Sequence, residues 1–107
     1  GLPLDRFAFE GFLPRKEGKR RKRLERLRGE ERTVILYESP HRLIRLLEEI
    51  REVLGEDRPI VVAKEMTKLY EGFYRGNAGE ILDRLRGEKV LGEYTVLIAG
   101  VSPEVGK

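Results

Sequence analysis

The sequence has no cysteine and no tryptophan, and it has only one histidine and one methionine among its 107 residues. Without a thiol, the chain cannot form disulfides, thiolate zinc sites, iron–sulfur clusters or a cysteine nucleophile. A single histidine also excludes a metal site with several imidazole ligands. No apolar run approaches the roughly 20 residues that cross a bilayer, and residues 1–11 lack the pattern of a secretory signal. These absences favour a cytoplasmic protein without a metal centre.

The length and composition suit one domain. At 12.4 kDa and with 39% hydrophobic residues, the chain falls in the usual size range of a single domain. A chain of this size buries roughly 60–70% of the surface of its unfolded state, which is enough for one hydrophobic core. Two independent cores are therefore not expected.

Charged residues are abundant and unevenly distributed. The chain has 22 Lys and Arg against 19 Asp and Glu, which gives a formal net charge of +3. Clustered cations neutralise phosphates, so the segment from residue 15 to residue 28 indicates contact with nucleic acid, without sequence specificity. The alternative, a solvated helix face or linker that binds nothing, stays open. The segment contains nine basic residues and two acidic ones: Arg15, Lys16, Lys19, Arg20, Arg21, Lys22, Arg23, Arg26 and Arg28, with Glu17 and Glu25.

The pattern of apolar residues in the first third of the chain predicts two strands and a helix. Residues 7–13 alternate in the manner of an edge or lead-in strand. Residues 17–28 favour a helix that is mostly solvated, because only Leu24 and Leu27 are apolar. The apolar run at residues 33–37 is typical of a strand buried on both faces.

A second helix and strand follow directly and complete a strand–helix–strand unit. Ser39 is a suitable N-cap and Pro40 a suitable first helical residue, while Gly55 ends the periodic pattern. The next apolar run, residues 60–63, reads as another buried strand.

The last third of the chain predicts two further strands and a helix. Residues 69–75 are extended and pair antiparallel with the preceding strand. Asn77 and Glu80 form the spacing of a capping box, Gly87 ends the helix, and residues 93–100 form the last strand. The predicted fold class is α/β, with a mixed, mostly parallel sheet of four to five strands flanked by helices.

Polar residues follow two of the predicted strands. In open α/β sheets, ligands gather at the carboxyl ends of strands, where free helix amides favour acceptor groups. Residues 37–42 and 63–68 stand at such ends. For the first segment, simple capping by Ser39 and a surface position for His41 are the alternatives to a binding role. For the second, Lys64, Glu65 and Thr67 either bind a polar substrate or move a proton, or are solvent-facing turn residues.

Three segments, residues 9–16, 37–42 and 63–68, resemble in their order and separation the C-terminal half of the small-subunit ribosomal RNA methyltransferases of the tetrapyrrole methylase superfamily. The resemblance covers essentially the whole chain. It implies an S-adenosylmethionine-dependent enzyme that methylates the ribose 2′-hydroxyl of a cytidine in the decoding region of small-subunit (16S) ribosomal RNA. Glu38 stands where many tetrapyrrole methylases carry Met, which favours the RNA branch over the porphyrin branch.

The same resemblance implies a domain organisation. Residues 1–16 would be the interdomain connection and lead-in strand, and residues 17–107 the C-terminal α/β domain of the methylase. The N-terminal domain, whose Gly-rich loops supply much of the cofactor pocket in the superfamily, is absent from this sequence. We expect the fragment to fold alone, to bind the cofactor poorly and to be inactive.

Site residues and partners are implied in the same way. The catalytic base is not assigned, although Lys64, Glu65 and Glu38 are candidates if they reach the cleft. The partner is ribosomal RNA of the small subunit or the assembled subunit, without a membrane, and a homodimer is left open. The residues implied in cofactor binding are Tyr37, Glu38, Ser39, Glu65, Met66, Thr67, Ala99 and Gly100. The expected RNA contacts are Arg15, Lys16, Lys19, Arg20, Arg21, Lys22, Arg23 and Arg26.

Two other functions are consistent with the residues alone. One is a non-catalytic basic module that binds RNA or a ribosomal surface. The other is a domain of a small-molecule methylase of the tetrapyrrole type, in which the basic helix is only a solvated face. RNA binding that depends on salt would disfavour the second of these.

Overall fold

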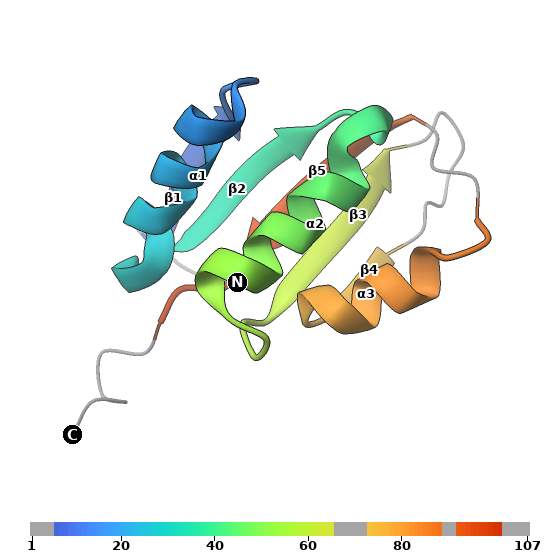
Figure 1. Cartoon of the computed structure of the whole chain (residues 1–107). Coiled ribbons are helices and arrows are strands. Elements are labelled where there is room, and N and C mark those ends of the chain that lie inside the picture. The colour runs from blue at the N-terminus through green and yellow to red at the C-terminus, as the bar shows by residue number, and fades with distance from the viewer. Residues whose placement is uncertain (1–5, 66–72, 89–91, 102–107) are drawn as a thin grey trace.

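The computed structural model describes residues 6–65, 73–88 and 92–101 of the chain, and its elements follow the predicted order (Figure 1). Met66 and Thr67 lie outside the described residues, as do the first four residues of the strand predicted at 69–75. The elements are β1 (Phe7–Phe12), α1 (Glu17–Arg26), the 3₁₀ turn η2 (Leu27–Gly29), β2 (Thr33–Glu38), α2 (Pro40–Leu54), β3 (Ile60–Glu65), β4 (Phe73–Gly76), α3 (Ala78–Leu85) and β5 (Glu93–Ile98).

The strands form one mixed five-stranded sheet in the order β1-β2-β5-β3-β4. The predicted mixed sheet and its edge strand β1 are confirmed. However, β1 and β2 are the parallel pair, while β2–β5, β5–β3 and β3–β4 are antiparallel. The neighbour relations are mostly antiparallel, rather than mostly parallel, because β5 is inserted between β2 and β3 and runs against both.

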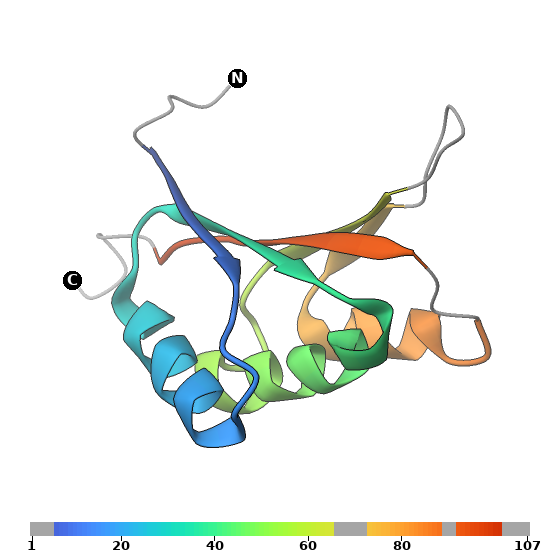
Figure 2. The same ribbon diagram turned by 90° about the horizontal axis from the view of Figure 1, so that it is seen from above.

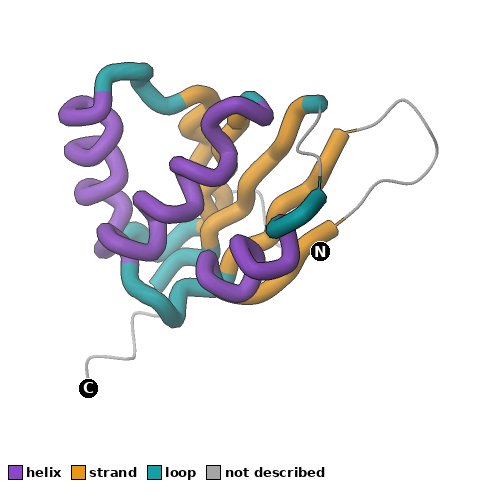
Figure 3. The backbone as a smooth tube through the Cα atoms, turned by 45° about the vertical axis from the view of Figure 1, so that its right-hand side comes forward, coloured by secondary structure: helices purple, strands orange, loops and turns teal. Residues whose placement is uncertain are grey.

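The sheet and the helices form two layers. Helices α1, α2 and α3 all cover the same face of the sheet, as Figures 2 and 3 show from two directions. Leu36, Val62 and Val96 on that face pack against Leu43 and Leu47 of α2, and all five are fully buried. Each such side chain stabilises the fold by about 1.5–3 kcal/mol relative to an exposed position. In the described part of the chain, no helix covers the other face, and none is long and apolar enough to cross a membrane.

The helix boundaries follow the predicted signals. Ser39 is the N-cap residue of α2 and Pro40 its first residue, and Gly55 ends the helix with a φ of 102°. The predicted capping box of α3 is present, because the Glu80 amide donates to Asn77 Oδ1 and the Asn77 amide to Glu80 Oε1, both at 2.9 Å.

Strand β1 contains a bulge that matters for the uncovered face. Phe9 is opposite Ile35 and Gly11 is opposite Leu36, so Glu10 is an extra residue in the pairing. Gly11 adopts a φ of 69°, a conformation that is strained for residues with a Cβ. Because side chains alternate between faces along a strand, the extra residue turns both Phe9 and Phe12 to the uncovered face.

Candidate functional site

One row of residues crosses all five strands on the uncovered face, near the C-terminal ends of β1, β2 and β3. The pairings join Phe12 to Tyr37, Tyr37 to Thr95, Thr95 to Ala63 and Ala63 to Phe73. Each of the five strands therefore contributes one residue to this row. We call these five residues the strand-end row.

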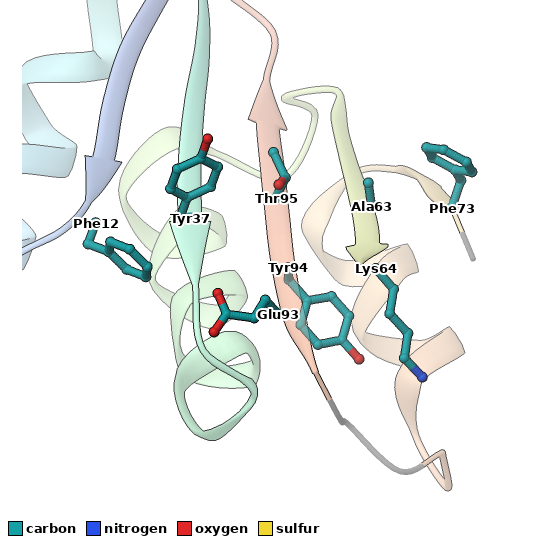
Figure 4. A pocket seen from close by; sticks show the side chains of 8 residues that line it. All are labelled: Phe12, Tyr37, Ala63, Lys64, Phe73, Glu93, Tyr94 and Thr95. Carbon is teal, nitrogen blue, oxygen red and sulfur yellow. The ribbon is translucent and has the colours of Figure 1, made fainter. Parts of the chain in front are cut away.

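A hollow of about 490 Å³ lies over the strand-end row (Figure 4). The rings of Tyr37 and Phe73 stand on either side of Thr95 and Ala63, whose small side chains leave the space between them. Besides the row itself, Lys64, Glu93 and Tyr94 line the hollow. The site predicted at the carboxyl ends of the strands thus coincides with a hollow.

The aromatic residues of this face are unusually exposed. Phe9 is 64%, Phe12 57%, Phe73 55% and Tyr37 39% exposed. The Tyr37 ring has its centroid 5.4 Å from that of Phe9 and 5.6 Å from that of Phe12, in edge-to-face and tilted arrangements. Contiguous exposed aromatic surface on a small protein is typical of a binding surface.

Glu38 does not point to this hollow. It follows Tyr37 in β2, so it faces the helices, where it is 2% exposed. Its Oε1 accepts a hydrogen bond from the Ser39 amide at 2.8 Å and pairs with Arg42 Nε at 3.3 Å. This carboxylate is committed to the protein itself, which makes it a poor candidate for a catalytic base.

Ser39 occupies the predicted cap position without making the predicted bond. Its side chain makes no capping hydrogen bond to α2, and its Oγ is a buried polar atom with no partner in the structure. A buried hydroxyl without a partner costs free energy, and it is a site where a ligand group can supply the missing bond.

The second predicted segment is only partly within the described chain. Lys64 is half-buried at the end of β3 and lines the hollow, and no described carboxylate pairs with it. Glu65 is the last residue of β3, opposite Glu93 in β5. Lys64 and Glu93 are the titratable groups other than tyrosine among the described side chains that line the hollow.

Ala99 and Gly100 lie at the opposite ends of the strands from this row. β5 runs antiparallel to β2, so the end of β5 lies beside the start of β2. The Ala99 amide donates to the Pro59 carbonyl at 3.0 Å, and a Cβ on Gly100 would overlap the carbonyl of Glu31. The structure therefore contradicts the expectation that Ala99 and Gly100 share a site with residues 37–39.

The residues that β5 contributes to the hollow are Glu93, Tyr94 and Thr95, which the sequence analysis did not single out. A signal for them was present. The strand before α3 is predicted to run antiparallel to β3, and a strand–helix–strand crossover through α3 makes β5 parallel to that strand. β5 must therefore run antiparallel to β3. The start of β5, and not its end, must then lie where β3 ends.

The cations of α1 fall into groups that differ in their partners. Lys19, Lys22 and Arg26 are exposed, and they form no ion pair with any described residue. Their spacing of three and four residues places them on one side of the helix, opposite the buried Leu24. We call Lys19, Lys22 and Arg26 the cationic stripe.

Arg20 differs from the cationic stripe. It is 3% exposed, and its guanidinium donates to Glu49 Oε1 from Nη2 at 2.7 Å and from Nε at 3.1 Å. Nη1 lies 3.5 Å from Glu38 Oε2. A buried guanidinium held by two carboxylates cannot meet a phosphate at the surface, so the expectation that Arg20 contacts RNA is wrong.

The remaining cations of the segment are exposed or half-buried. Arg21 pairs with Glu52 at 3.2 Å and Arg23 with Glu10 at 2.9 Å. Arg15 and Lys16 are exposed, with no ion pair among the described residues. A second hollow of about 320 Å³, between α1 and α2, is lined by Arg15, Glu17, Arg20, His41, Arg42, Arg45 and Glu49.

The chain is similar to proteins of a known family. The profile of the family described as Tetrapyrrole (Corrin/Porphyrin) Methylases matches residues 1–82. Curated relatives named Ribosomal RNA small subunit methyltransferase I are 44% identical over 104 residues in Synechocystis sp., 46% over 101 in Thermotoga maritima and 48% over 98 in Escherichia coli O157:H7. These alignments cover 97%, 94% and 85% of this chain, but only 37%, 44% and 34% of the relatives. The chain thus spans less than half the length of these relatives.

Solved structures share the fold. A cobalt precorrin-4 methyltransferase of cobalamin biosynthesis matches with a TM-score of 0.60 at 20% identity, over 86% of this chain and 40% of that chain. The methyltransferase CobJ matches with a TM-score of 0.59 at 20% identity, over 89% of this chain and 41% of that chain. At these identities the likeness concerns the arrangement of the mixed sheet and its helices.

Proposed function

Because the chain belongs to the tetrapyrrole (corrin/porphyrin) methylase family, we propose that it is the C-terminal domain of an S-adenosylmethionine-dependent methyltransferase of small-subunit ribosomal RNA. The proposed reaction is methylation of a cytidine 2′-hydroxyl in the decoding region. The 44–48% identity to ribosomal RNA methyltransferases supports the substrate class. The observation that carries the proposal is the cationic stripe, because three exposed cations without carboxylate partners are available to phosphates.

The residues at the strand ends fit part of a cofactor site. The buried Ser39 Oγ lacks a partner and can bond a polar group of S-adenosylmethionine. Tyr37 offers an exposed ring beside it in sequence, at the edge of the hollow. We therefore assign Tyr37 and Ser39 to cofactor contact, together with Glu65 at the end of β3. The same role is proposed for Met66 and Thr67, which follow Glu65 in the sequence, on the resemblance to the family alone. Glu38 contributes by holding the turn in place, since it bonds the Ser39 amide.

Methyl transfer to a ribose hydroxyl requires that the hydroxyl lose its proton as the new bond forms. When bound, S-adenosylmethionine supplies the electrophilic methyl group. Lys64 and Glu93 line the hollow, and we propose them as candidates to hold or accept the proton. Of these, Lys64 can also stabilise negative charge that develops on the ribose oxygen.

The decisive experiment is a charge-reversal comparison in the full-length enzyme. The variant Lys19→Glu, Lys22→Glu and Arg26→Glu removes the cationic stripe. The control Arg32→Glu, Arg51→Glu and Arg86→Glu changes the net charge equally at exposed cations that have carboxylate partners. Arg20 is left intact, because its substitution would damage the core and not the surface.

We expect the stripe variant to lose methylation of small ribosomal subunits, measured with labelled cofactor, while the control retains it. The stripe variant should keep its affinity for S-adenosylmethionine in calorimetry, because the stripe lies on α1, away from the strand-end row. Equal activity of the two variants would overturn the proposed RNA contact. Methylation of a small molecule with no effect of either variant would support the tetrapyrrole-type alternative.

A further inference from the structure

The uncovered face of the sheet combines exposed aromatic rings with cations that lack partners. We propose that Phe12 and Phe73, the rings at the two ends of the strand-end row, are stacking surfaces for unpaired bases of an RNA strand, on either side of the cofactor contact assigned to Tyr37. This inference rests on the proposed function, because it adds base contacts to the phosphate contacts assigned to the cationic stripe. The part of the substrate that this face receives is single-stranded RNA, not helical RNA.

The dimensions of the row suit more than one base. Four spacings between five neighbouring strands, at about 4.8 Å each, give the row a width of about 19 Å. Its ends carry rings, with Phe12 and Tyr37 at one end and Phe73 at the other, and small residues lie between them. Single-stranded nucleic acid binds such platforms through base stacking on exposed aromatic side chains, largely independently of sequence.

The bulge in β1 also supports a binding role for the uncovered face. If residues 9–12 paired regularly, without the bulge, the alternation of β1 would turn Phe12 toward the helices while Phe9 stayed on the uncovered face. Gly11 permits the bulge by its positive φ. The sequence thus uses a backbone conformation that favours glycine to place a second ring on a surface that no described helix covers.

The charges around the row favour RNA over a protein partner. Arg15 and Lys16 follow β1 after two residues, Lys64 is the last but one residue of β3, and Arg75 lies in β4. None of these four pairs with a described carboxylate. Glu93 is the acidic side chain among the described residues that line the hollow. Protein interfaces are depleted in lysine, whereas a strand of phosphates needs cations beside the stacked bases.

The position of β1 links the two parts of the proposed RNA site. β1 is the edge strand, and the chain runs from Phe12 through Arg15 and Lys16 directly into α1. Figure 2 shows α1 on one side of this edge and the uncovered face on the other. An RNA strand on the cationic stripe would therefore reach the strand-end row by passing around β1.

The test is binding of a fluorescein-labelled, ten-nucleotide single-stranded pyrimidine RNA to the 107-residue chain, followed by anisotropy at several salt concentrations. The variant Phe12→Leu with Phe73→Leu keeps apolar surface but removes two rings. The matched variant Phe12→Tyr with Phe73→Tyr keeps both rings. Both residues are more than half exposed, so the fold is expected to persist, which circular dichroism checks.

We expect the leucine variant to bind about fivefold more weakly or worse, with an unchanged salt slope, and the tyrosine variant to bind like the parent. In the variant Tyr37→Trp, the single tryptophan should be quenched when RNA binds. A stripe variant should behave differently, with a salt slope that is shallower by about 2, since each phosphate contact on a single strand contributes about 0.7.

Equal RNA affinity of the leucine variant and the parent would overturn the stacking surface. If the stripe variant still loses affinity in that case, the proposed function stands and this inference alone fails. If neither variant changes RNA binding, both fail. Self-association of the chain that the leucine variant abolishes, with RNA affinity unchanged, would assign the face to a second copy of the protein instead.

Discussion

Helix α1 has two sides that carry the same charge in opposite surroundings. Arg20 is buried between two carboxylates, whereas Lys19, the residue before it, is exposed and has no described partner. One residue along a helix is a rotation of about 100°, which is enough to separate core from solvent. The comparison teaches that a run of cations in a sequence does not tell how many of them can bind a ligand. The carboxylate that each cation meets decides this.

The first prediction tests the core side of α1. We expect Arg20→Met to lower the free energy of unfolding by about 3–5 kcal/mol, because it leaves the buried carboxylates of Glu38 and Glu49 without their main partner. Lys19→Met on the solvent side should change it by less than about 0.5 kcal/mol. Urea unfolding followed by circular dichroism measures both.

The control for this prediction removes a carboxylate as well. Adding Glu49→Leu to Arg20→Met should recover part of the lost stability, since one uncompensated buried charge is then gone. If Arg20→Met and Lys19→Met destabilise equally, the buried network has no special role and the contrast between the two sides disappears.

The second prediction concerns a cation of intermediate exposure. Arg23 pairs with Glu10 of β1 at 2.9 Å, and the two side chains are 39% and 24% exposed. A double-mutant cycle with Arg23→Gln and Glu10→Gln should give a coupling of about 0.2–1 kcal/mol that shrinks with added salt. A coupling as large as that of Arg20 would show that partial exposure does not weaken such pairs.

Most of the fold could be predicted from local signals. The signals at Ser39, Pro40, Asn77 and Gly55 mark the helix ends correctly, because helix ends depend on neighbouring residues, although the Ser39 side chain makes no capping hydrogen bond. The insertion of β5 between β2 and β3 could not be read from apolar runs, since a buried strand has the same composition in either direction. The order and direction of strands depend on pairing between distant segments.

The position of the candidate site could be predicted only in part, for the same reason. Tyr37 and Lys64 do line one hollow, because each lies next to the last residue of its strand and the two strands run in the same direction. Ala99 and Gly100 were misplaced because β5 runs the other way. The burial of Arg20 could not be foreseen, since it depends on Glu38 and Glu49, which are 18 and 29 residues away along the chain.

The third prediction has the smallest effect and concerns a pair at the surface. Arg32 donates to Glu30 from Nε at 2.8 Å and from its backbone amide at 3.0 Å, and these bonds lower the pKa of Glu30 from 4.5 to about 2. A carboxylate with a lowered pKa in the folded state stabilises the fold above its unfolded pKa, so this contribution is present above about pH 4.5 and is lost as the pH falls toward 2. Solvent screening keeps the gain small, because Arg32 is exposed. In an NMR titration, Arg32→Gln should raise the pKa of Glu30, and the free energy of unfolding at pH 7 should fall only by the small amount that corresponds to this rise. A large loss of stability in this variant would show that a surface ion pair can stabilise this fold as much as the buried contacts of Arg20 with Glu38 and Glu49.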